Sequence, residues 1–206
     1  LIDADDPALR AAEGPMFRAL AARREELAAA LKEGERRTAG LGFPLQAEAA
    51  PDGFQLFIFD GGERKLLFVS EDGADAVDKR RTFRMPREAL VRLAGERPDL
   101  FSNNVLTRPL MQEYLFPVLA TVLGPGEIAY WSQLKEAFAL FGYSTPVVVP
   151  RQQYTLLEGT IQRQMEKFGV TFDDVWRRYG KIFDAWLRAQ DEHGVAGRFA
   201  AAKASF

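Results

Sequence analysis

The feature that most constrains this chain is a pair of short apolar runs separated by a glycine-rich turn and a helix-like pattern. Val118 to Leu123 is continuous and partly β-branched, as expected for a buried strand. The turn Gly124-Pro125-Gly126-Glu127 follows, and Pro146 to Pro150 reads as a second strand. Between them, apolar residues recur every three or four positions up to Gly142: Ile128, Trp131, Leu134, Phe138 and Phe141. A strand, turn, helix and strand within about 35 residues predict a βαβ unit with parallel strands and a right-handed crossover.

Polar residues interrupt the apolar stretch that leads into this unit. Arg108, Gln112, Glu113 and Glu127 lie at separated points between Asn104 and Trp131. Pro109 can occupy the first turn of a helix, which we expect from Leu110 to Leu115, and Pro117 cannot continue it. The polar residues therefore fall before the helix, on it and after the strand, while the strand itself stays apolar.

The first 40 residues are predicted to be helical. Asp5-Asp6 can cap a first helix that begins at Pro7, and a second helix is expected from Pro15 to Glu33, with Gly34 as its stop. Leu1-Ile2 resembles the end of a strand, and the first residue is not Met. We therefore expect the chain to be a piece of a longer protein.

Residues 42–70 change to a period of two. Three strands are expected there, over "FPLQAE", "FQLFIFD" and "RKLLFVS", joined by turns at Pro51-Asp52-Gly53 and Asp60-Gly61-Gly62. They predict a small antiparallel sheet. Pro86-Arg87-Glu88 then opens a helix whose buried face carries Leu90, Leu93 and Ala94.

The last part of the chain is predicted to be helical and incompletely packed. One helix should start near Tyr154 and break at Gly169, and Thr171 should cap another whose first turn holds Asp173-Asp174. One face of the second helix is wide and aromatic: Val175, Tyr179, Ile182, Phe183 and Trp186. Such a face needs a partner helix, from a longer chain or another subunit. His193 is expected to cap the helix end, and residues 195–206 to be weakly structured.

Composition narrows the classes of function. The chain of 206 residues has a formal net charge of −2, no cysteine and one histidine. These values disfavour nucleic-acid binding, disulfides, thiolate chemistry and a metal site, and they agree with a cytoplasmic protein. The N-terminus does not resemble a signal peptide, and the longest apolar run is about half the roughly 20 residues that a membrane-spanning helix needs.

The predicted βαβ unit brings candidate ligand-binding residues to one edge. Ligands of parallel sheets bind at the carboxyl ends of the strands, where the turn containing Gly124 and Gly126 should meet Arg151. The turn could offer backbone N–H groups to an anion, or could be only a tight strand-to-helix connection in which Glu127 caps the helix.

Two arginines are candidate clamps for a carboxylate or phosphate. Arg108 and Arg151 each flank an apolar segment beside a proline. The alternative is an internal ion pair, for example of Arg108 with Glu113 or Glu127. Gln112 and Tyr130 could orient a ligand or could satisfy buried backbone groups.

Residues 101–158 resemble a known family. The features are Asn104, Arg108-Pro109, Gln112-Glu113, Pro117, Gly124-Pro125, Glu127, Ala129-Tyr130 and Pro150-Arg151, followed by "TLLE". In this order they resemble the BshC proteins, the bacillithiol synthases or cysteine ligases. The chain departs from the family pattern at Asn103, where a proline is usual, and at Glu113, where aspartate is common. It also lacks the family's other Rossmann half, with its Thr-Gly-Gln-Gln and Glu-Asp-His-Asp segments.

The resemblance implies an α/β protein, with a Rossmann-like core, a small antiparallel insertion and a helical coiled coil that mediates homodimers. On that map, residues 1–40 are a helical connection, 41–100 the insertion, 101–152 the second half of the core, and 153–206 the start of the coiled coil. The implied reaction adds cysteine to glucosaminyl-malate, the last step of bacillithiol biosynthesis, with a nucleotide as a conceivable cofactor. The alternative function is a non-catalytic helical interaction or dimerisation module.

Overall fold

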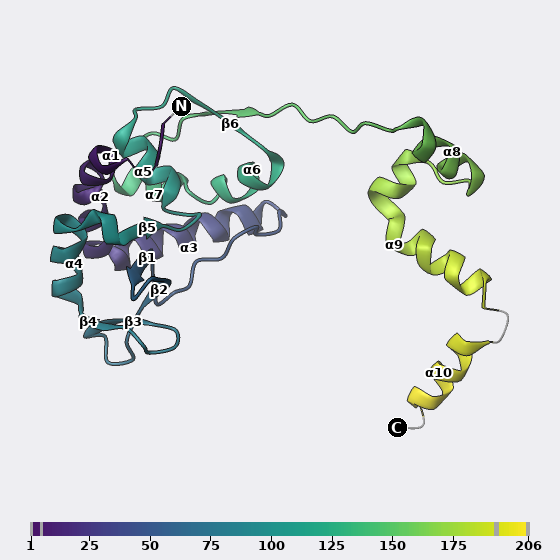
Figure 1. Ribbon diagram of the computed structural model, residues 1–206, viewed down its shortest axis with the longest axis horizontal. Helices are drawn as coiled ribbons and strands as arrows, with labels where there is room; N and C mark the ends of the chain where they lie inside the picture. Colours follow the sequence, from purple (N-terminus) through teal and green to yellow (C-terminus); the bar gives the residue numbers. More distant parts are fainter. Residues whose placement is uncertain (1, 5, 192–193, 205–206) are drawn as a thin grey trace. The chain divides into compact units, whose positions relative to one another are not determined.

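The computed structural model describes residues 2–4, 6–191 and 194–204. The chain divides into two compact units, Leu1–Gln152 and Gln153–Phe206, and Figure 1 traces both. The predicted strand at Leu1-Ile2 falls partly outside the described residues, and Ile2 lies in no regular element. Asp6 caps α1 as predicted, because its carboxylate accepts hydrogen bonds from the amides of Ala8 and Leu9.

Three helices open the first unit. They are α1 (Pro7–Ala12), α2 (Gly14–Ala22) and α3 (Arg24–Gly40). The prediction of one helix from Pro15 to Glu33 was wrong, because Arg23 leaves the helical conformation (φ −101°, ψ 28°) and separates α2 from α3.

Gly34 does not stop a helix; it lies inside α3. A Cβ atom at this position would stand 1.9 Å from the carbonyl oxygen of Gln133. The glycine therefore allows α3 to approach the backbone that follows α6. This tertiary contact, and not a helix end, explains why position 34 holds a glycine.

The larger of the two sheets in the first unit has five strands in the order β4-β3-β2-β1-β5. The strands are β1 (Gly53–Asp60), β2 (Glu63–Val69), β3 (Asp75–Asp78), β4 (Arg84–Pro86) and β5 (Phe101–Asn103), and all pairs are antiparallel. The predicted hairpin is confirmed, with Asp60 paired to Glu63 across Gly61 and Gly62. Both glycines have positive φ, which a tight hairpin turn requires.

The expected strand "FPLQAE" is absent, and residues 43–48 form no strand. Its alternation of polar and apolar residues misled the prediction, because a strand also needs a neighbour. Just after this segment, the amide of Ala49 donates to the Glu35 carboxylate of α3 at 2.7 Å. The N–H group of Ala49 is thus bound by a helix side chain and not by a neighbouring strand.

Helices cover one face of this sheet. Helix α4 (Arg87–Glu96) buries Leu90 and Ala94 as predicted and packs against α2 (Figure 1), and the 3₁₀ turn η1 (Pro98–Leu100) leads into β5. The largest fully buried side chains include Phe17, Leu20, Leu31, Phe54, Leu56, Leu90, Phe101 and Phe138. One hydrophobic core thus joins the helices, the sheet and the segment that follows it.

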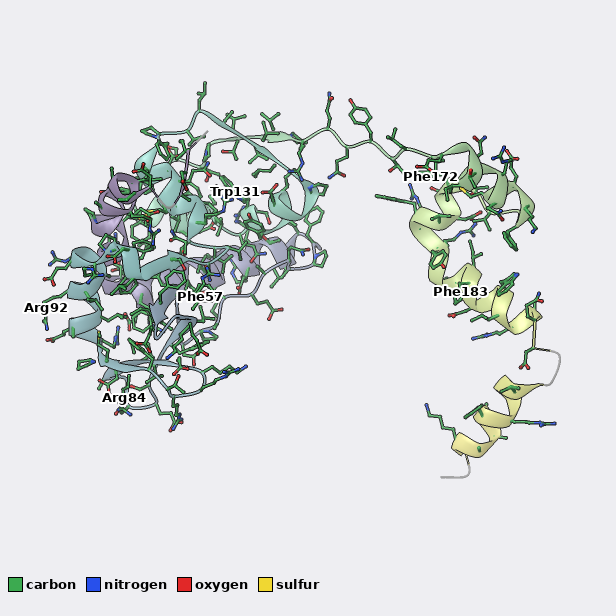
Figure 2. All side chains as sticks on the ribbon, viewed as in Figure 1. Phe57, Arg84, Arg92, Trp131, Phe172 and Phe183 are labelled. Carbon is green, nitrogen blue, oxygen red and sulfur yellow. The ribbon has the colours of Figure 1, made fainter. Side chains whose placement is uncertain are left out.

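The predicted βαβ unit is confirmed. Helix α5 (Arg108–Leu115) precedes β6 (Ala120–Leu123), and β7 (Val147–Pro150) pairs with β6 in parallel. The crossover is two short helices rather than the single one predicted, α6 (Pro125–Trp131) and α7 (Lys135–Leu140). Trp131, Leu134 and Phe138 are buried, as their spacing predicted, and Trp131 is labelled in Figure 2.

The strands of this unit are less buried than predicted. Val122 is 60% exposed and Val147 is 63% exposed, whereas Leu123 is only 2% exposed. The described residues supply just two strands to this sheet, so most of its apolar side chains have no strand or helix over them. The prediction of a buried strand from Val118 to Leu123 is therefore wrong except at Leu123.

The second unit consists of α8 (Gly159–Lys167), α9 (Phe172–Ala189) and α10 (Val195–Ala204). Residues 154–158 are not helical, so the first helix starts later than predicted. Thr171 and Asp174 cap α9 reciprocally, as predicted for Thr171. The tail expected to be weakly structured forms α10, while His193 lies outside the described residues. The coiled coil stays a prediction.

Candidate functional site

The carboxyl ends of β6 and β7 meet, as the parallel arrangement requires. Leu123 pairs with Pro150, and the Arg151 amide donates to the Leu123 carbonyl at 2.8 Å. Gly124 and Arg151, the residues that follow the two strands, are therefore neighbours. The predicted edge exists in the structure.

Arg151 lies against the turn that opens α6. A Cβ atom on Gly124 would stand 2.3 Å from Arg151 Nη2, so a side chain there would displace the guanidinium. Glu127 Oε2 accepts a hydrogen bond from the Gly124 amide at 2.8 Å and lies 3.6 Å from Arg151 Nη1. Glu127 thus caps the helix and neutralises Arg151. Around Gly126, by contrast, a Cβ atom would meet nothing within 4 Å.

Arg108 stands at the first position of α5 and is exposed. Its Nη1 donates to Gln112 Oε1 at 3.1 Å, and its Nη2 donates to the Tyr130 hydroxyl at 3.5 Å. Both partners are neutral. Because a guanidinium carries five N–H donors, further donors remain for an anion.

The predicted ion pairs of Arg108 are not formed. Glu127 pairs with Arg151, and Glu113 accepts a hydrogen bond from the Val118 amide at 3.3 Å. Within the residues that the structure describes, Arg108 has no carboxylate partner. Between the two alternatives, the geometry therefore favours a guanidinium available to a ligand.

Helix α6 links the two arginines. Glu127 and Tyr130 are three residues apart on this helix, and each contacts one arginine. Tyr130 is only 8% exposed, so its hydroxyl holds the Arg108 side chain from a buried ring. The candidate site thus consists of two adjoining clusters, Arg108 with Gln112 and Tyr130, and Arg151 with Gly124 and Glu127.

Sequence reasoning missed the residues that hold the start of α5. Gln55 of β1 accepts a hydrogen bond from Asn104 Nδ2 at 2.8 Å, and its carbonyl accepts one from the Thr107 hydroxyl at 2.9 Å. Gln55 is buried and adopts a positive φ of 58°. A glutamine between Phe54 and Leu56 reads as an outward-facing strand residue, so the pattern held no signal for this role.

The described residues show neither a metal cluster nor a membrane span. No group of three or more potential ligands among His, Asp and Glu gathers within the described ranges. Nor does any helix in those ranges have the length and apolar character needed to cross a bilayer.

Comparison with known proteins identifies close similarities. A family model described as "Bacillithiol biosynthesis BshC, N-terminal Rossmann-like domain" matches residues 1–152. Relatives named "Putative cysteine ligase BshC" are 40% identical over 205 residues in Geobacillus thermodenitrificans and 37% identical over 206 residues in Symbiobacterium thermophilum. These alignments cover 99% and 100% of this chain but only 38% and 37% of the relatives. The chain therefore spans less than two fifths of their length.

Proposed function

Because the chain belongs to the BshC family of bacillithiol biosynthesis, we propose that it forms part of a cysteine ligase and that Arg108 holds an anionic group of a substrate. The proposed reaction joins cysteine to glucosaminyl-malate through an amide bond, in the cytoplasm. Cysteine and malate both carry carboxylates, so such an enzyme needs cationic groups that bind them. The supporting observation is the guanidinium of Arg108, which is exposed and bound only to neutral partners.

Gln112 and Tyr130 are proposed to orient the guanidinium. They bind opposite terminal nitrogens of Arg108, so the plane of the group is set from two sides. A preoriented guanidinium loses little conformational entropy when it binds a planar carboxylate, which favours bidentate recognition. Gln112 and Tyr130 carry no negative charge, so neither competes with an anion for the Arg108 guanidinium.

Arg151 is proposed to be a second clamp that Glu127 regulates. Its guanidinium lies over Gly124 and beside the Glu127 carboxylate, so an incoming anion has to compete with that carboxylate. Arg151 is exposed and Glu127 is partly exposed, and ion pairs at the surface are worth at most about 1 kcal/mol. A phosphate or carboxylate can therefore displace it. If a nucleotide activates the reaction, its phosphates are candidate occupants of this edge, close to Gly126.

Substitution of Arg108 by Ala in the complete enzyme tests the proposal. We expect amide formation from cysteine and glucosaminyl-malate to fall by at least about 100-fold, because a clamping guanidinium contributes several kcal/mol to the bound state. Arg92→Ala is the matched control, since Arg92 is an exposed arginine on α4 (Figure 2). Wild-type turnover in Arg108→Ala would refute the clamp. Unfolding of that variant alone would instead indicate a structural role.

A second candidate function rests on the exposed aromatic face of α9. Tyr179 and Trp186 of this helix are 60% and 46% exposed, and Phe183 stacks between them, as the labelled ring in Figure 2 helps to locate. A groove of about 370 Å³ lies between α8 and α9. Exposed patches of this kind mark interaction sites. We propose that this face forms a helical dimer interface and that the second unit serves assembly.

Oligomeric state tests that alternative separately. Replacing Phe183 and Trp186 by Gln should convert a dimer to monomers in sedimentation experiments, because it removes apolar area from the contact. Replacing the exposed Arg163 and Arg177 by Gln is the control. A dimer that survives the aromatic substitutions would contradict the proposed interface and leave the anion site untouched.

A further inference from the structure

Strand β1 contains a backbone irregularity at Gln55. Its register with β2 shifts between Gly53 and Phe57, and Gln55 within this interval has a φ of 58°. A left-handed conformation is uncommon for a residue with a Cβ atom, and it costs free energy that a glycine would avoid. Gln55 is also only 4% exposed, so the cost is accompanied by burial of an amide side chain.

Both the nitrogen and the oxygen of the buried Gln55 amide are hydrogen-bonded. Gln55 Nε2 donates to the Ala50 carbonyl at 3.0 Å, and Gln55 Oε1 accepts from Asn104 Nδ2 at 2.8 Å. The Gln55 carbonyl accepts from the Thr107 hydroxyl at 2.9 Å and from the Asn104 amide at 3.4 Å. Both the carbonyl and the side chain of Gln55 therefore bind the segment that precedes α5.

That segment is the turn that delivers Arg108. Asn104 Oδ1 accepts hydrogen bonds from the amides of Leu106 and Thr107 at 2.9 and 3.0 Å. The Arg108 amide donates to the Asn104 carbonyl at 3.0 Å. Asn104 thus closes the turn, and Gln55 holds Asn104 by its side-chain amide. Only one residue separates Gln55 from the backbone of Arg108 in this chain of hydrogen bonds.

We infer that Gln55 is a positioning residue that sets the place and direction of Arg108 through Asn104. The inference rests on the proposed role of Arg108 as an anion clamp and extends it to a second element of the fold. A displacement of about 1 Å at a clamp can cost on the order of 100-fold in rate. A strained and buried residue that fixes the clamp is therefore consistent with selection for function rather than for stability.

The hydrogen bonds at position 55 require a side chain that both donates and accepts, as the glutamine amide does. A glutamate would turn a carboxylate oxygen towards the Ala50 carbonyl, where Gln55 Nε2 now donates. A leucine of similar size would leave the Ala50 carbonyl and Asn104 Nδ2 without these partners. Glycine is the informative substitution, because it accepts the left-handed backbone without strain while removing the side chain.

The experiment compares Gln55→Gly with wild type in the complete enzyme, using turnover of cysteine and glucosaminyl-malate. We expect kcat/KM to fall by about 10- to 100-fold while Tm stays within about 5 °C. Gln46→Gly, at an exposed residue between α3 and β1, is the matched control and should leave kcat/KM unchanged. If Gln55→Gly unfolds, Gln55→Asn replaces it, since asparagine tolerates positive φ but its amide is one methylene shorter.

A double-mutant cycle with Arg108→Ala separates positioning from mere stability. In the Arg108→Ala background, Gln55→Gly should change kcat/KM by less than about twofold, because the clamp that it positions is already gone. Independent, multiplicative losses would overturn the positioning role, as would normal turnover of folded Gln55→Gly and Gln55→Asn. Full turnover of Arg108→Ala alone would instead overturn the proposed function, so the two failures are distinguishable.

Discussion

The helices α5 and α6 both begin next to a proposed anion clamp, but they are held in different ways. At α5, the hydrogen bonds that Gln55 accepts from Asn104 and Thr107 fix the turn, and Thr107 is fully buried. At α6, the surface carboxylate of Glu127 binds the Gly124 amide and the exposed Arg151. One helix start depends on the interior of the protein, and the other on local surface contacts.

This difference bears on how the two arginines can work. Arg108 extends from a fixed turn and has no counter-ion among the described residues. Arg151 is 58% exposed at its side chain and already lies near a carboxylate. A preorganised cation binds an anion at a lower entropic cost, whereas a paired one has to exchange partners. Arg108 is therefore the expected primary clamp and Arg151 the adjustable one.

The largest effect is expected at the C-terminal end of α6, where the backbone of Gln133 contacts α3 at Gly34. Gly34→Ala would place a methyl group 1.9 Å from the Gln133 carbonyl, so α3 and the α6–α7 connection would have to separate. We expect a loss of about 3 kcal/mol in the free energy of unfolding, measured by urea denaturation of the 206-residue chain. The variant tests whether α6, loosely held at its start, depends on this contact.

The same helix provides a matched control. A Cβ atom at Gly40, the last residue of α3, would meet nothing within 4 Å. Gly40→Ala should leave stability unchanged or raise it slightly, because alanine favours the helix. Equal losses in the two variants would mean that the contact with Gln133 is not what constrains Gly34.

The next largest effect is expected at the start of α5. Thr107→Val keeps the shape of the side chain but removes the hydroxyl that donates to the Gln55 carbonyl at 2.9 Å. We expect a loss of about 1–2 kcal/mol in unfolding free energy, since a buried acceptor loses its main partner. Thr107→Ser retains the hydroxyl and should restore that hydrogen bond. If both variants are equally stable, the α5 turn does not depend on the interior.

The same contrast explains what the sequence could predict. The Gly124-to-Glu127 turn, Glu127 as a cap and Arg151 at the strand end follow from local rules, because the interacting residues are adjacent or lie at paired strand ends. Gln55 meets Asn104, 49 residues away, in a left-handed conformation that no local pattern signals. The start of α6 was therefore predictable, and the support of α5 was not.

Tertiary contacts also account for two of the errors in the predicted fold. Gly34 resembles a helix stop until Gln133 is placed beside it. Residues 43–48 alternate like a strand, but no neighbouring strand pairs with them. The hairpin across Gly61 and Gly62 was predictable because its signal is contained in the turn itself. Local rules thus held at the Gly61-Gly62 hairpin and at the start of α6, where the interacting residues are close in sequence.

The start of helix α9 is a third case for comparison, and the cap there depends on the ionisation of Asp174. Hydrogen bonds from the Thr171 hydroxyl and amide, together with Arg178, lower the pKa of Asp174 from 3.8 to about 2. The folded helix favours the carboxylate form of Asp174. The stability that Asp174 adds to α9 is therefore fully present above pH 3.8 and is lost as the pH falls through about 2. Amide NMR signals of Thr171 and Asp174 should report this loss.

Asp174→Asn is the control for that titration. It removes the ionisable group, so the acid-dependent change at Thr171 should disappear while other carboxylates still titrate. An unchanged titration of Thr171 in the variant would assign the transition to another group.

The smallest effect is expected from Glu127→Gln. The amide oxygen of glutamine can still accept from the Gly124 amide, so the cap persists while the charge beside Arg151 is removed. Because Arg151 is exposed and Glu127 is partly exposed, the free energy of unfolding should change by less than about 0.5 kcal/mol. Binding of inorganic phosphate, measured by calorimetry, should strengthen because Arg151 no longer has a competing carboxylate, and Arg151→Gln should abolish that gain. A loss of stability as large as that of Thr107→Val would mean that α6 is held as firmly as α5, and Arg151 could not then be the adjustable clamp.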